Sequence, residues 1–284
     1  MAGDLHTHST FSDGSVPIER LPVLARAAGL SHLAVTDHDT LQSVRFARSF
    51  QAEGLTLIPG VELTAKDFER GRSVHLLCYF PQETAELAAF CRKMKRRRNA
   101  ATAESAQRVK ELFPAFTTRA AWRYSADSGV LYKTSIIRVL YDYAYTDGIY
   151  RELYRQLFGK NGSCRVDPAY DDVYDVLAMI GRAGGVTVFA HPSVYESMEL
   201  CEECARRQLV DGVEVNHPRN TAGDRVALLN LAQQYELIVT GGTDFHGMNM
   251  AKPFPVGAYT TSEGQIQRLL NAARQKRKNM TKPL

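Results

Sequence analysis

Seven strand-like segments, most of them separated by helical segments, constrain the fold of this 284-residue chain more than any other feature. The predicted strands are short apolar runs at residues 4–8, 33–35, 55–58, 74–80, 186–190, 212–217 and 237–240. Alternation of strands and helices is typical of parallel β/α units. The chain is therefore predicted to form an α/β fold in which the carboxyl ends of the strands meet at one face.

Histidine and carboxylate side chains gather at the ends of these predicted strands. Seven of the eight histidines lie in a strand or just after one, and only His32 instead begins a strand. His6 and His8 are two residues apart on an extended segment, so their imidazoles project from the same side. Asp13 follows on a turn closed by Gly14. A His-x-His pair also occurs without any metal, so the prediction depends on the other histidines.

Taken singly, each of these polar residues has an ordinary structural explanation. His75 could be a core histidine, His191 a loop residue before a proline, and Glu214 or Asp244 a helix cap. Taken together, they are expected to meet at one face, where burial without cations would cost several kcal/mol per group by order of magnitude. The sequence therefore predicts a multinuclear metal site, and its nitrogen and oxygen ligands suit manganese, iron or zinc.

The strand and helix alternation stops at Pro81 and returns after about Val166. We therefore predict a main domain formed by residues 1–81 and 166–284, and a helical, basic insertion at residues 82–165 that caps the site. The insertion includes a cationic run at residues 92–98. This run could follow an RNA backbone, or it could be a solvated helix face, since it contains no aromatic residue on which a base could stack.

Charge and hydropathy place few further limits on function. The net charge of +4 allows an anionic small molecule or nucleic acid as a ligand without requiring either. No apolar run approaches the roughly 18 residues of a membrane helix, so no membrane association is expected. The five cysteines lack the spacing of a disulfide framework, which predicts a cytoplasmic protein. Cys201 and Cys204 are expected to lie on an acidic helix, and no obligate protein partner is evident.

The order of the motifs resembles that of the PHP (polymerase and histidinol phosphatase) family. The resemblance is carried by His6-Thr7-His8 with Ser12-Asp13-Gly14, Thr36-Asp37-His38, Gly60-Val61-Glu62, His75, Ala190-His191-Pro192, Gly212-Val213-Glu214 and Thr243-Asp244-Phe245-His246. It spans nearly the whole chain outside the insertion. The resemblance implies a distorted (β/α)7 barrel with a helical insertion subdomain.

The resemblance also implies three divalent metal ions and assigns their ligands. The first ion would be held by His6, His8, Glu62 and Asp244. Glu62 would bridge to a second ion that also takes His75 and His191. Asp13, His38 and His246 would hold the third ion, and Asp37 would orient a ligand imidazole. Manganese is the metal that the resemblance favours, with iron and zinc as alternatives.

Two cations that share a carboxylate, about 3.5–4 Å apart, can hold a bridging hydroxide that is nucleophilic at neutral pH. We therefore predict a phosphoesterase in which a metal-bound hydroxide attacks a phosphomonoester in line. His217 lies three residues after Glu214 and is a candidate general acid for the leaving oxygen. Alternatively, it is a rim residue whose position reflects only the adjacent Pro218.

The insertion indicates the class of phosphate ester. It resembles that of the family branch that hydrolyses nucleoside 3',5'-bisphosphates and short 5'-phosphorylated oligoribonucleotides. Lys133 and Arg138 match the cationic positions of that branch and are the predicted substrate contacts. Ser135 stands where a histidine is expected, and Lys133 where an arginine is more usual. Lysine keeps the charge but loses the bidentate fork, which changes how a phosphate would be bound.

Two other functions fit the sequence. The first keeps the chemistry and changes the substrate to histidinol phosphate or another small phosphomonoester, which predicts little discrimination for a nucleoside base. The second is a metal-stabilised nucleic-acid-binding or polymerase-associated module without hydrolytic activity. A complete set of ligand residues favours the enzyme over this second alternative.

Overall fold

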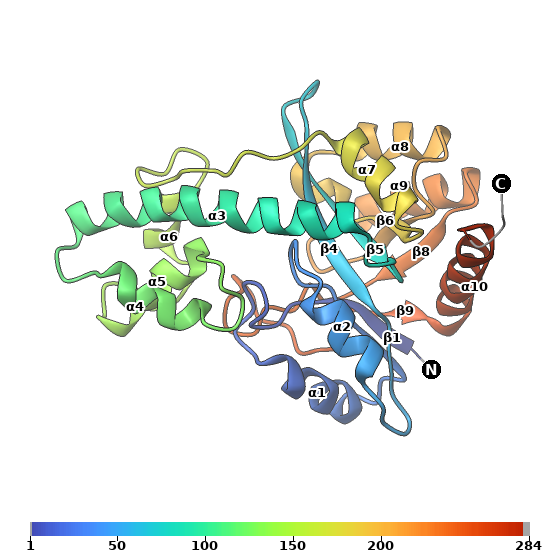
Figure 1. The fold of residues 1–284 in the computed structure, drawn as a ribbon, viewed down its shortest axis with the longest axis horizontal. Helices are drawn as coiled ribbons and strands as arrows, with labels where there is room; N and C mark the ends of the chain where they lie inside the picture. Colours follow the sequence, from blue (N-terminus) through green and yellow to red (C-terminus); the bar gives the residue numbers. More distant parts are fainter. Residues whose placement is uncertain (1, 281–284) are drawn as a thin grey trace.

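The computed structural model of the protein describes residues 2–280, which form two β-sheets flanked by helices (Figure 1). The first sheet has the strand order β3-β2-β1-β9. Its strands are β1 (Ala2–Thr7), β2 (His32–Val35), β3 (Thr56–Leu57) and β9 (Thr261–Ser262). β1, β2 and β3 are parallel, as the alternating pattern predicts, whereas β9 pairs antiparallel to β1.

The second sheet has the strand order β4-β5-β6-β7-β8. Its strands are β4 (Gly60–Asp67), β5 (Arg72–Tyr79), β6 (Val186–Phe189), β7 (Gly212–Asn216) and β8 (Ile238–Gly241). β6, β7 and β8 are parallel, but β5 runs antiparallel to both of its neighbours. A purely parallel arrangement is therefore wrong for this part of the chain. Glu62 lies within a β-hairpin strand and not in a turn after a strand.

The two sheets approach each other where the predicted ligands lie. Isolated bridges join Thr7 to Phe245 and His38 to Glu62, so the end of the first sheet contacts both edges of the second. Within residues 2–280 the regular strand ladders make two sheets and not one closed barrel. The fold is thus mixed α/β, with its polar residues collected at the junction of the sheets.

Helices cover the outer faces of both sheets. They are α1 (Leu21–Ala27), α2 (Gln42–Ser49), α7 (Val173–Arg182), α8 (Met198–Arg206), α9 (Ala222–Gln234) and α10 (Glu263–Met280). Local sequence explains where several of them begin: Asp172 caps α7, and Thr221 and Asp224 form a capping box at α9. The polar, lysine-rich sequence of residues 275–284 predicts a frayed tail, but α10 continues through residues 275–280, and residues 281–284 lie outside the described part.

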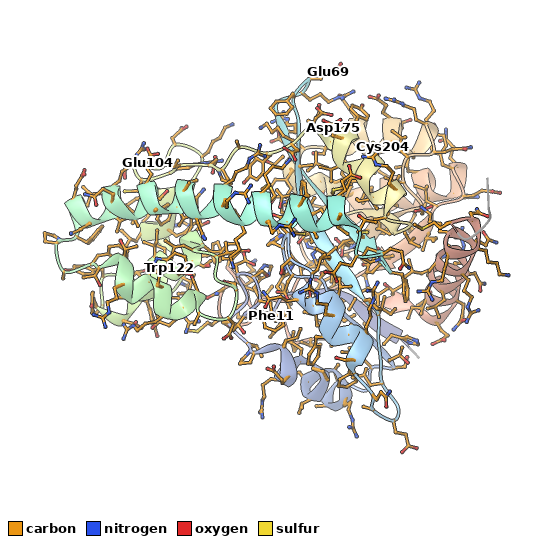
Figure 2. All side chains as sticks on the ribbon, in the orientation of Figure 1. Phe11, Glu69, Glu104, Trp122, Asp175 and Cys204 are labelled. Atoms are coloured by element: carbon orange, nitrogen blue, oxygen red, sulfur yellow. The ribbon has the colours of Figure 1, made fainter. Side chains whose placement is uncertain are left out.

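The insertion is helical, as predicted, and has an apolar core of its own. It contains α3 (Ala85–Leu112), α4 (Thr118–Trp122), α5 (Lys133–Asp142) and α6 (Glu152–Phe158). α3 extends from the sheets over the other insertion helices, and Glu104 lies on its outer face (Figures 1 and 2). Leu87 and Met94 in its first half pack into the core of the main body, whereas Val109 packs with Leu140 inside the insertion. α3 therefore belongs to both parts.

The cationic run at residues 92–98 joins the insertion to the main body. Lys93 and Arg97 both pair with Asp171, the Arg97 contact at 2.8 Å. Arg98 donates to Asp39 Oδ2 from Nε at 3.0 Å and from Nη2 at 2.6 Å. Neither predicted role, binding of an RNA backbone or a fully solvated helix face, describes Lys93, Arg97 and Arg98. All three form ion pairs with carboxylates of the protein. Arg92 and Arg96 remain exposed.

The described residues contain no helix that is both long enough and apolar enough to span a membrane. All five cysteines are free and buried, and Cys201 and Cys204 lie on the inner face of α8 as expected.

Candidate metal centre

The first two imidazoles of the centre are fixed by the end of β1. His6 lies in β1 and His8 just after it, and both are fully buried. The chain then turns sharply, and a Cβ atom on Gly14 would lie 2.5 Å from the His8 carbonyl oxygen. Glycine is therefore required there for the turn to bring Asp13 back toward the histidines. Gly242 permits a similar approach, since a Cβ atom there would lie 2.3 Å from His6 Cβ.

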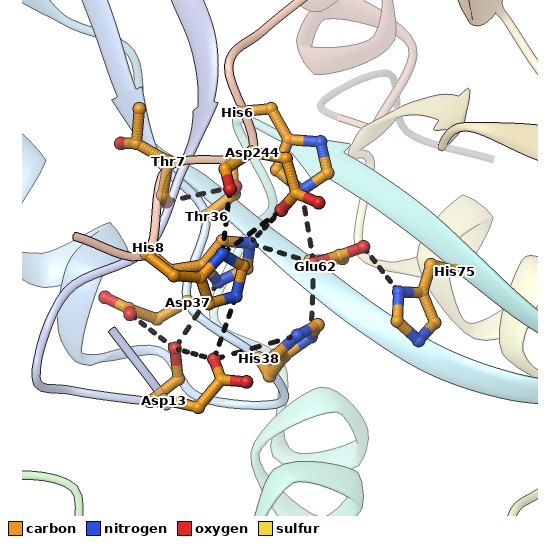
Figure 3. Close-up of polar contacts among 12 residues, drawn as sticks. His6, Thr7, His8, Asp13, Thr36, Asp37, His38, Glu62, His75 and Asp244 are labelled. Atoms are coloured by element: carbon orange, nitrogen blue, oxygen red, sulfur yellow. Dashed lines mark hydrogen bonds and ion pairs between the residues drawn. The ribbon is translucent and has the colours of Figure 1, made fainter. Parts of the chain in front are cut away.

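Glu62 lies at the middle of the centre, and its two oxygens face different histidines (Figure 3). Oε2 lies 3.2 Å from His6 Nε2 and 3.1 Å from His8 Nε2. Oε1 lies 2.7 Å from His75 Nδ1 and 3.1 Å from His191 Nε2. A carboxylate placed in this way can bridge two cations.

Asp244 and Asp13 supply the other carboxylates. Asp244 Oδ1 lies 3.5 Å from His6 Nε2 and 3.3 Å from His8 Nε2, so it faces the same nitrogens as Glu62 Oε2. Asp13 Oδ1 lies 3.2 Å from His246 Nε2 and 3.9 Å from His38 Nε2. All nine predicted ligands are therefore brought together by segments that are far apart in the sequence.

The grouping of these side chains differs in detail from the predicted one. The sets whose ligand atoms lie within 4.8 Å of one another are His8, Asp13, His38 and His246; His6, His8 and Asp244; His6, Glu62 and His191; and His38, Glu62 and His75. His8 thus adjoins the Asp13 group as well as the Asp244 group. His38 Nδ1 also lies 3.1 Å from Glu62 Oε2, so His38 stands between two groups.

The unpaired atoms of these residues fit bound cations. His6 Nε2, His8 Nε2, His38 Nδ1 and Glu62 Oε2 are buried, and within residues 2–280 none makes a hydrogen bond of acceptable geometry. Buried polar atoms are normally hydrogen-bonded because leaving them unpaired is costly. Imidazole and carboxylate donors directed at common points are the donor set that divalent transition metals take.

Charge coupling keeps the carboxylates of the centre ionised. Burial alone would raise the pKa of Glu62, but the imidazoles of His38, His75 and His6 outweigh it and hold this pKa well below its usual range. Burial also opposes protonation of His8, yet Asp244 and Glu62 raise the pKa of His8 to about 10. A metal ion that takes His8 must therefore displace a proton, which makes binding stronger as pH rises.

Backbone strain is concentrated beside the ligands. His191 has φ 25° and Asp244 has φ 50°, and Asp39, which follows His38, has φ 51°. Positive φ is uncommon for residues other than glycine and tends to persist at functional sites, where the surrounding structure holds it in place. Here Asp244 N donates to the His6 carbonyl at 2.8 Å, which fixes the strained residue against β1.

Asp37 contacts the ligand His8 only indirectly, through Ser12. It is fully buried and accepts hydrogen bonds from Ser9 N at 2.8 Å, Ser9 Oγ at 2.6 Å and Ser12 Oγ at 2.6 Å. Ser12 Oγ in turn lies 3.4 Å from His8 Nδ1. Asp37 thus fixes the turn that carries His8, and its contact with the imidazole is indirect.

His217 does not reach the mouth of the site. It is fully buried, its Nδ1 accepts from Arg219 N at 3.2 Å, and its Nε2 lies 3.3 Å from Asp244 Oδ2. Because Nδ1 is an acceptor, the ring proton lies on Nε2 and is donated to Asp244. Burial is the main cause that lowers the pKa of His217. This geometry suits a residue that orients Asp244 better than it suits the predicted general acid.

Of the two predicted substrate contacts, only Lys133 lines a cavity at the centre. Lys133 begins α5 and lies at the wall of a 230 Å³ cavity, where it pairs with Asp167 at 2.6 Å. Arg138 instead stacks on Tyr124, with its guanidinium carbon 4.2 Å from the ring centroid, and lines neither cavity at the centre. Lys133 and Arg138 are five residues apart on α5, so their side chains leave the helix in directions about 140° apart. The two cations therefore point to different places.

Glu214 contacts two of the predicted ligands, His6 and His191, although the sequence pattern gave it no role. Its Oε1 lies 2.9 Å from His6 Nδ1, and its Oε2 accepts from His191 N at 3.1 Å. A carboxylate on the far nitrogen of a ligand imidazole fixes its tautomer and orientation. The position of Glu214 at the end of β7 was the available signal, but a helix cap explained it equally well.

Removing divalent ions is expected to lower the melting temperature by about 5–15 °C for one tightly bound ion. An ion that binds only the folded protein contributes about 3–4 kcal/mol at 100 to 1,000 times its dissociation constant, and each kcal/mol is worth about 2–4 °C in a chain of this size. Thermal unfolding before and after chelation measures the shift, and adding manganese should reverse it. An unchanged melting temperature in protein shown to have lost its metal would contradict the assignment.

Comparison with known proteins adds independent information. The sequence profile of the PHP domain matches residues 4–183. The phosphoribosyl 1,2-cyclic phosphate 1,2-diphosphodiesterase of Eggerthella lenta is 36% identical over 87% of this chain and 95% of its own length. The 5'-3' exoribonuclease Rnm of Escherichia coli is 27% identical over 86% of this chain and 84% of its own.

A solved structure from Bifidobacterium adolescentis, assigned as a metal-dependent phosphoesterase, has a similar fold. Its TM-score is 0.85 at 25% sequence identity, and the match covers 95% of this chain and 96% of that one. The similarity extends over the insertion as well as the two sheets.

Proposed function

The chain belongs to the PHP family and is a metal-dependent phosphoesterase, and from that premise we propose that it hydrolyses a phosphate ester of a ribonucleotide. The observation that carries the proposal is the position of Glu62 at the floor of a 790 Å³ cavity, where its two oxygens face different sets of imidazoles. Such a carboxylate suits a site that binds more than one cation beside a substrate.

The proposed ligand set is the one implied by the family resemblance, with three divalent ions and manganese as the favoured metal. It comprises His6, His8, Asp13, His38, Glu62, His75, His191, Asp244 and His246. The orphaned nitrogens of His6, His8 and His38 support it. The two bridges between the sheets also support a distorted (β/α)7 barrel, and the five free cysteines support a reducing, cytoplasmic compartment.

When bound, the divalent ions would lower the pKa of a water molecule and neutralise charge on the phosphoryl group. The protein positions them through residues that touch the ligands: Glu214 orients His6, His217 orients Asp244, and Ser12 with Asp37 orients His8. Tyr150 and Tyr195 line both cavities beside the ligands and narrow the access of solvent. The chain thus supplies a preorganised polar site that needs little rearrangement during reaction.

His217→Asn is expected to reduce kcat/KM about 10- to 100-fold. This is the size of loss that typically follows when a residue that orients a metal ligand is replaced. The reduction should be the same for adenosine 3',5'-bisphosphate and for p-nitrophenyl phosphate. A general acid would instead matter far more for the nucleoside, whose alcohol is the poorer leaving group. Steady-state kinetics on both substrates decide between the two roles, and a loss confined to the nucleoside substrate would restore His217 as the acid.

The proposed substrate is a nucleoside 3',5'-bisphosphate or a short 5'-phosphorylated oligoribonucleotide. The exoribonuclease relative and the cationic wall formed by Lys133 and Arg98 support this class. A second candidate is a cyclic phosphate of phosphoribose, because the relative named for that substrate is 36% identical over nearly its full length. Both candidates place the reacting phosphate on a ribose.

A phosphate-release screen with manganese tests the proposal. The panel contains adenosine 3',5'-bisphosphate, a 5'-phosphorylated oligoribonucleotide, phosphoribosyl 1,2-cyclic phosphate, histidinol phosphate and p-nitrophenyl phosphate. We expect the ribonucleotides to be turned over with a kcat/KM that exceeds that of histidinol phosphate. Preference for histidinol phosphate would overturn the substrate class. Inactivity toward every phosphoester, combined with tight RNA binding, would overturn the enzymatic role.

A further inference from the structure

Two adjoining cavities meet at the metal centre, and they differ in size. The smaller has a volume of 230 Å³ and is roofed by the insertion, whereas the larger has a volume of 790 Å³. Both are lined by Asp13, His38, His75, Tyr150 and Tyr195. Small-molecule sites usually measure about 300–1,000 Å³. The smaller cavity suits one phosphate-sized group, whereas the larger accommodates a whole nucleotide.

The cations of the smaller cavity are already paired within the protein. Lys133 contacts Asp167, and Arg98 contacts both Asp39 and, at 2.6 Å, Thr64 Oγ1. A substrate phosphate would share these cations with carboxylates. The local net charge on this side of the centre is therefore modest.

The cations of the larger cavity have no such partners. Arg219 and Lys252 line it, both are exposed, and among residues 2–280 neither side chain has a hydrogen-bond or ion-pair partner. Arg219 follows His217 and Pro218, and Lys252 lies on the loop after His246, so each is attached to a segment that shapes the metal centre. Two unpaired cations beside an ester-cleaving site are available to a second anionic group.

The loop that carries Lys252 is fixed to the metal centre. Asn249 Nδ2 donates to the Asp13 carbonyl at 2.7 Å, and Met248 N donates to Ser15 Oγ at 2.8 Å. Asn249 is 5% exposed and lines the cavity, and its Oδ1 has no hydrogen-bond partner among the described residues. Phe254 also lines the cavity and packs edge-on to Tyr259 at 5.5 Å. The wall thus combines fixed cations, an orphaned acceptor and an aromatic ring.

We infer that the larger cavity binds the nucleotide downstream of the cleaved linkage, and that Arg219 and Lys252 contact the next phosphate along the chain. The inference rests on the proposed function and narrows its substrate to a 5'-phosphorylated oligoribonucleotide of at least three nucleotides. Water adds to the phosphorus, the O3'–P bond breaks, and the water proton passes to O3'. The first nucleotide leaves with a 3'-hydroxyl, and the phosphate stays on the downstream fragment.

This assignment fits the chemistry of single-stranded RNA. A base on the downstream nucleotide can stack on Phe254, since aromatic rings bind every base through its π-face. Phosphoribosyl 1,2-cyclic phosphate also carries a second phosphate, but on the same ribose as the reacting one, and it has no base that could stack on Phe254.

The test compares three adenosine substrates of increasing length. They are adenosine 3',5'-bisphosphate, 5'-phosphorylated diadenylate and 5'-phosphorylated triadenylate. Only the triadenylate carries a phosphate beyond the cleaved linkage. The variant is Arg219→Gln with Lys252→Gln, and its matched control is Arg206→Gln, which removes an exposed cation from α8.

The measured quantity is the ratio of kcat/KM for triadenylate to kcat/KM for the bisphosphate. In the double variant this ratio should fall about 10- to 100-fold, because the variant loses hydrogen bonds to a charged phosphate. The control variant should keep the wild-type ratio. Binding of an uncleavable phosphorothioate triadenylate provides a second measurement. The slope of log affinity against log salt should become shallower by about 0.7 for each lost phosphate contact.

The outcomes distinguish failure of the subsite from failure of the proposed function. An unchanged ratio and an unchanged salt slope, in an enzyme that cleaves both substrates, would overturn the subsite and leave the proposed function standing. Failure of the wild-type enzyme to cleave any of the three substrates with manganese would overturn the proposed function and the subsite with it. A lower ratio with a shallower slope supports the subsite.

Discussion

Replacing Glu62 with glutamine is expected to reduce kcat/KM by about a thousandfold or more and to lower the metal content of the purified protein. The substitution keeps the size of the side chain and removes its negative charge. Metal ions supply several kcal/mol of transition-state stabilisation, and each 1.36 kcal/mol is tenfold in rate. Both oxygens of Glu62 face imidazoles, so a single change affects two groups of ligands.

Metal analysis and phosphate release on the same preparation measure this effect. Glu53→Gln is the matched control, because Glu53 is exposed and lines neither cavity at the centre. Thermal unfolding without metal shows whether the variant still folds. A Glu62→Gln protein that keeps its full metal content and stays within tenfold of wild-type activity would show that Glu62 is not a bridging ligand.

Replacing Arg98 with methionine is expected to lower the free energy of unfolding by about 3–5 kcal/mol, which is typical when one partner of a buried ion pair is removed. The Arg98 and Asp39 side chains are 14% and 3% exposed, so the Asp39 charge would stay buried and lose its main partner. Burial alone would lower the pKa of Arg98, but Asp39 outweighs it and keeps the guanidinium charged. The melting temperature should fall by about 6–20 °C.

A double substitution isolates the pair itself. Adding Asp39→Asn to Arg98→Met removes the stranded charge and keeps a residue that tolerates the positive φ at position 39. The double variant should therefore recover part of the lost stability, as a double-mutant cycle would reveal. Arg96→Met is the control, since Arg96 is an exposed neighbour on the same helix. Equal destabilisation by Arg96→Met and Arg98→Met would show that the buried pair contributes nothing specific.

The convergence of these histidines and carboxylates could be predicted from the sequence because their positions follow a periodic pattern. Histidines and carboxylates recur at strand ends, and strand ends of an α/β fold converge. His75 shows the limit of this rule: it lies in the middle of β5, and the antiparallel pairing of β4 and β5 brings it to Glu62. The sequence predicts a turn at residues 59–62, and no local pattern there distinguishes a turn from the hairpin strand β4 that the structure shows.

The other differences between the predicted and the observed site arise from contacts between residues far apart in the sequence. Such contacts cannot be recognised in a single sequence. Arg98 belongs to a cationic run that resembles a solvated helix face, and only the fold places Asp39 beside it. His217 lies on a predicted rim, yet the backbone N–H of Arg219 and the carboxylate of Asp244 occupy both of its ring nitrogens. Glu214 fits a helix cap as well as it fits an orienting carboxylate. Each of these roles depends on which segments meet.

The uninterrupted course of α3 determines how large molecules gain access to the centre. The helix is 28 residues long and spans about 42 Å at 1.5 Å per residue. It has no break at which the insertion could swing, and Arg98 ties its middle to the strand end that bears His38. We therefore expect the insertion to keep one position over the centre during turnover. If the substrate is an oligoribonucleotide, as proposed above, it must reach the centre without the insertion moving aside, which a flexible single strand does more readily than a rigid base-paired stem.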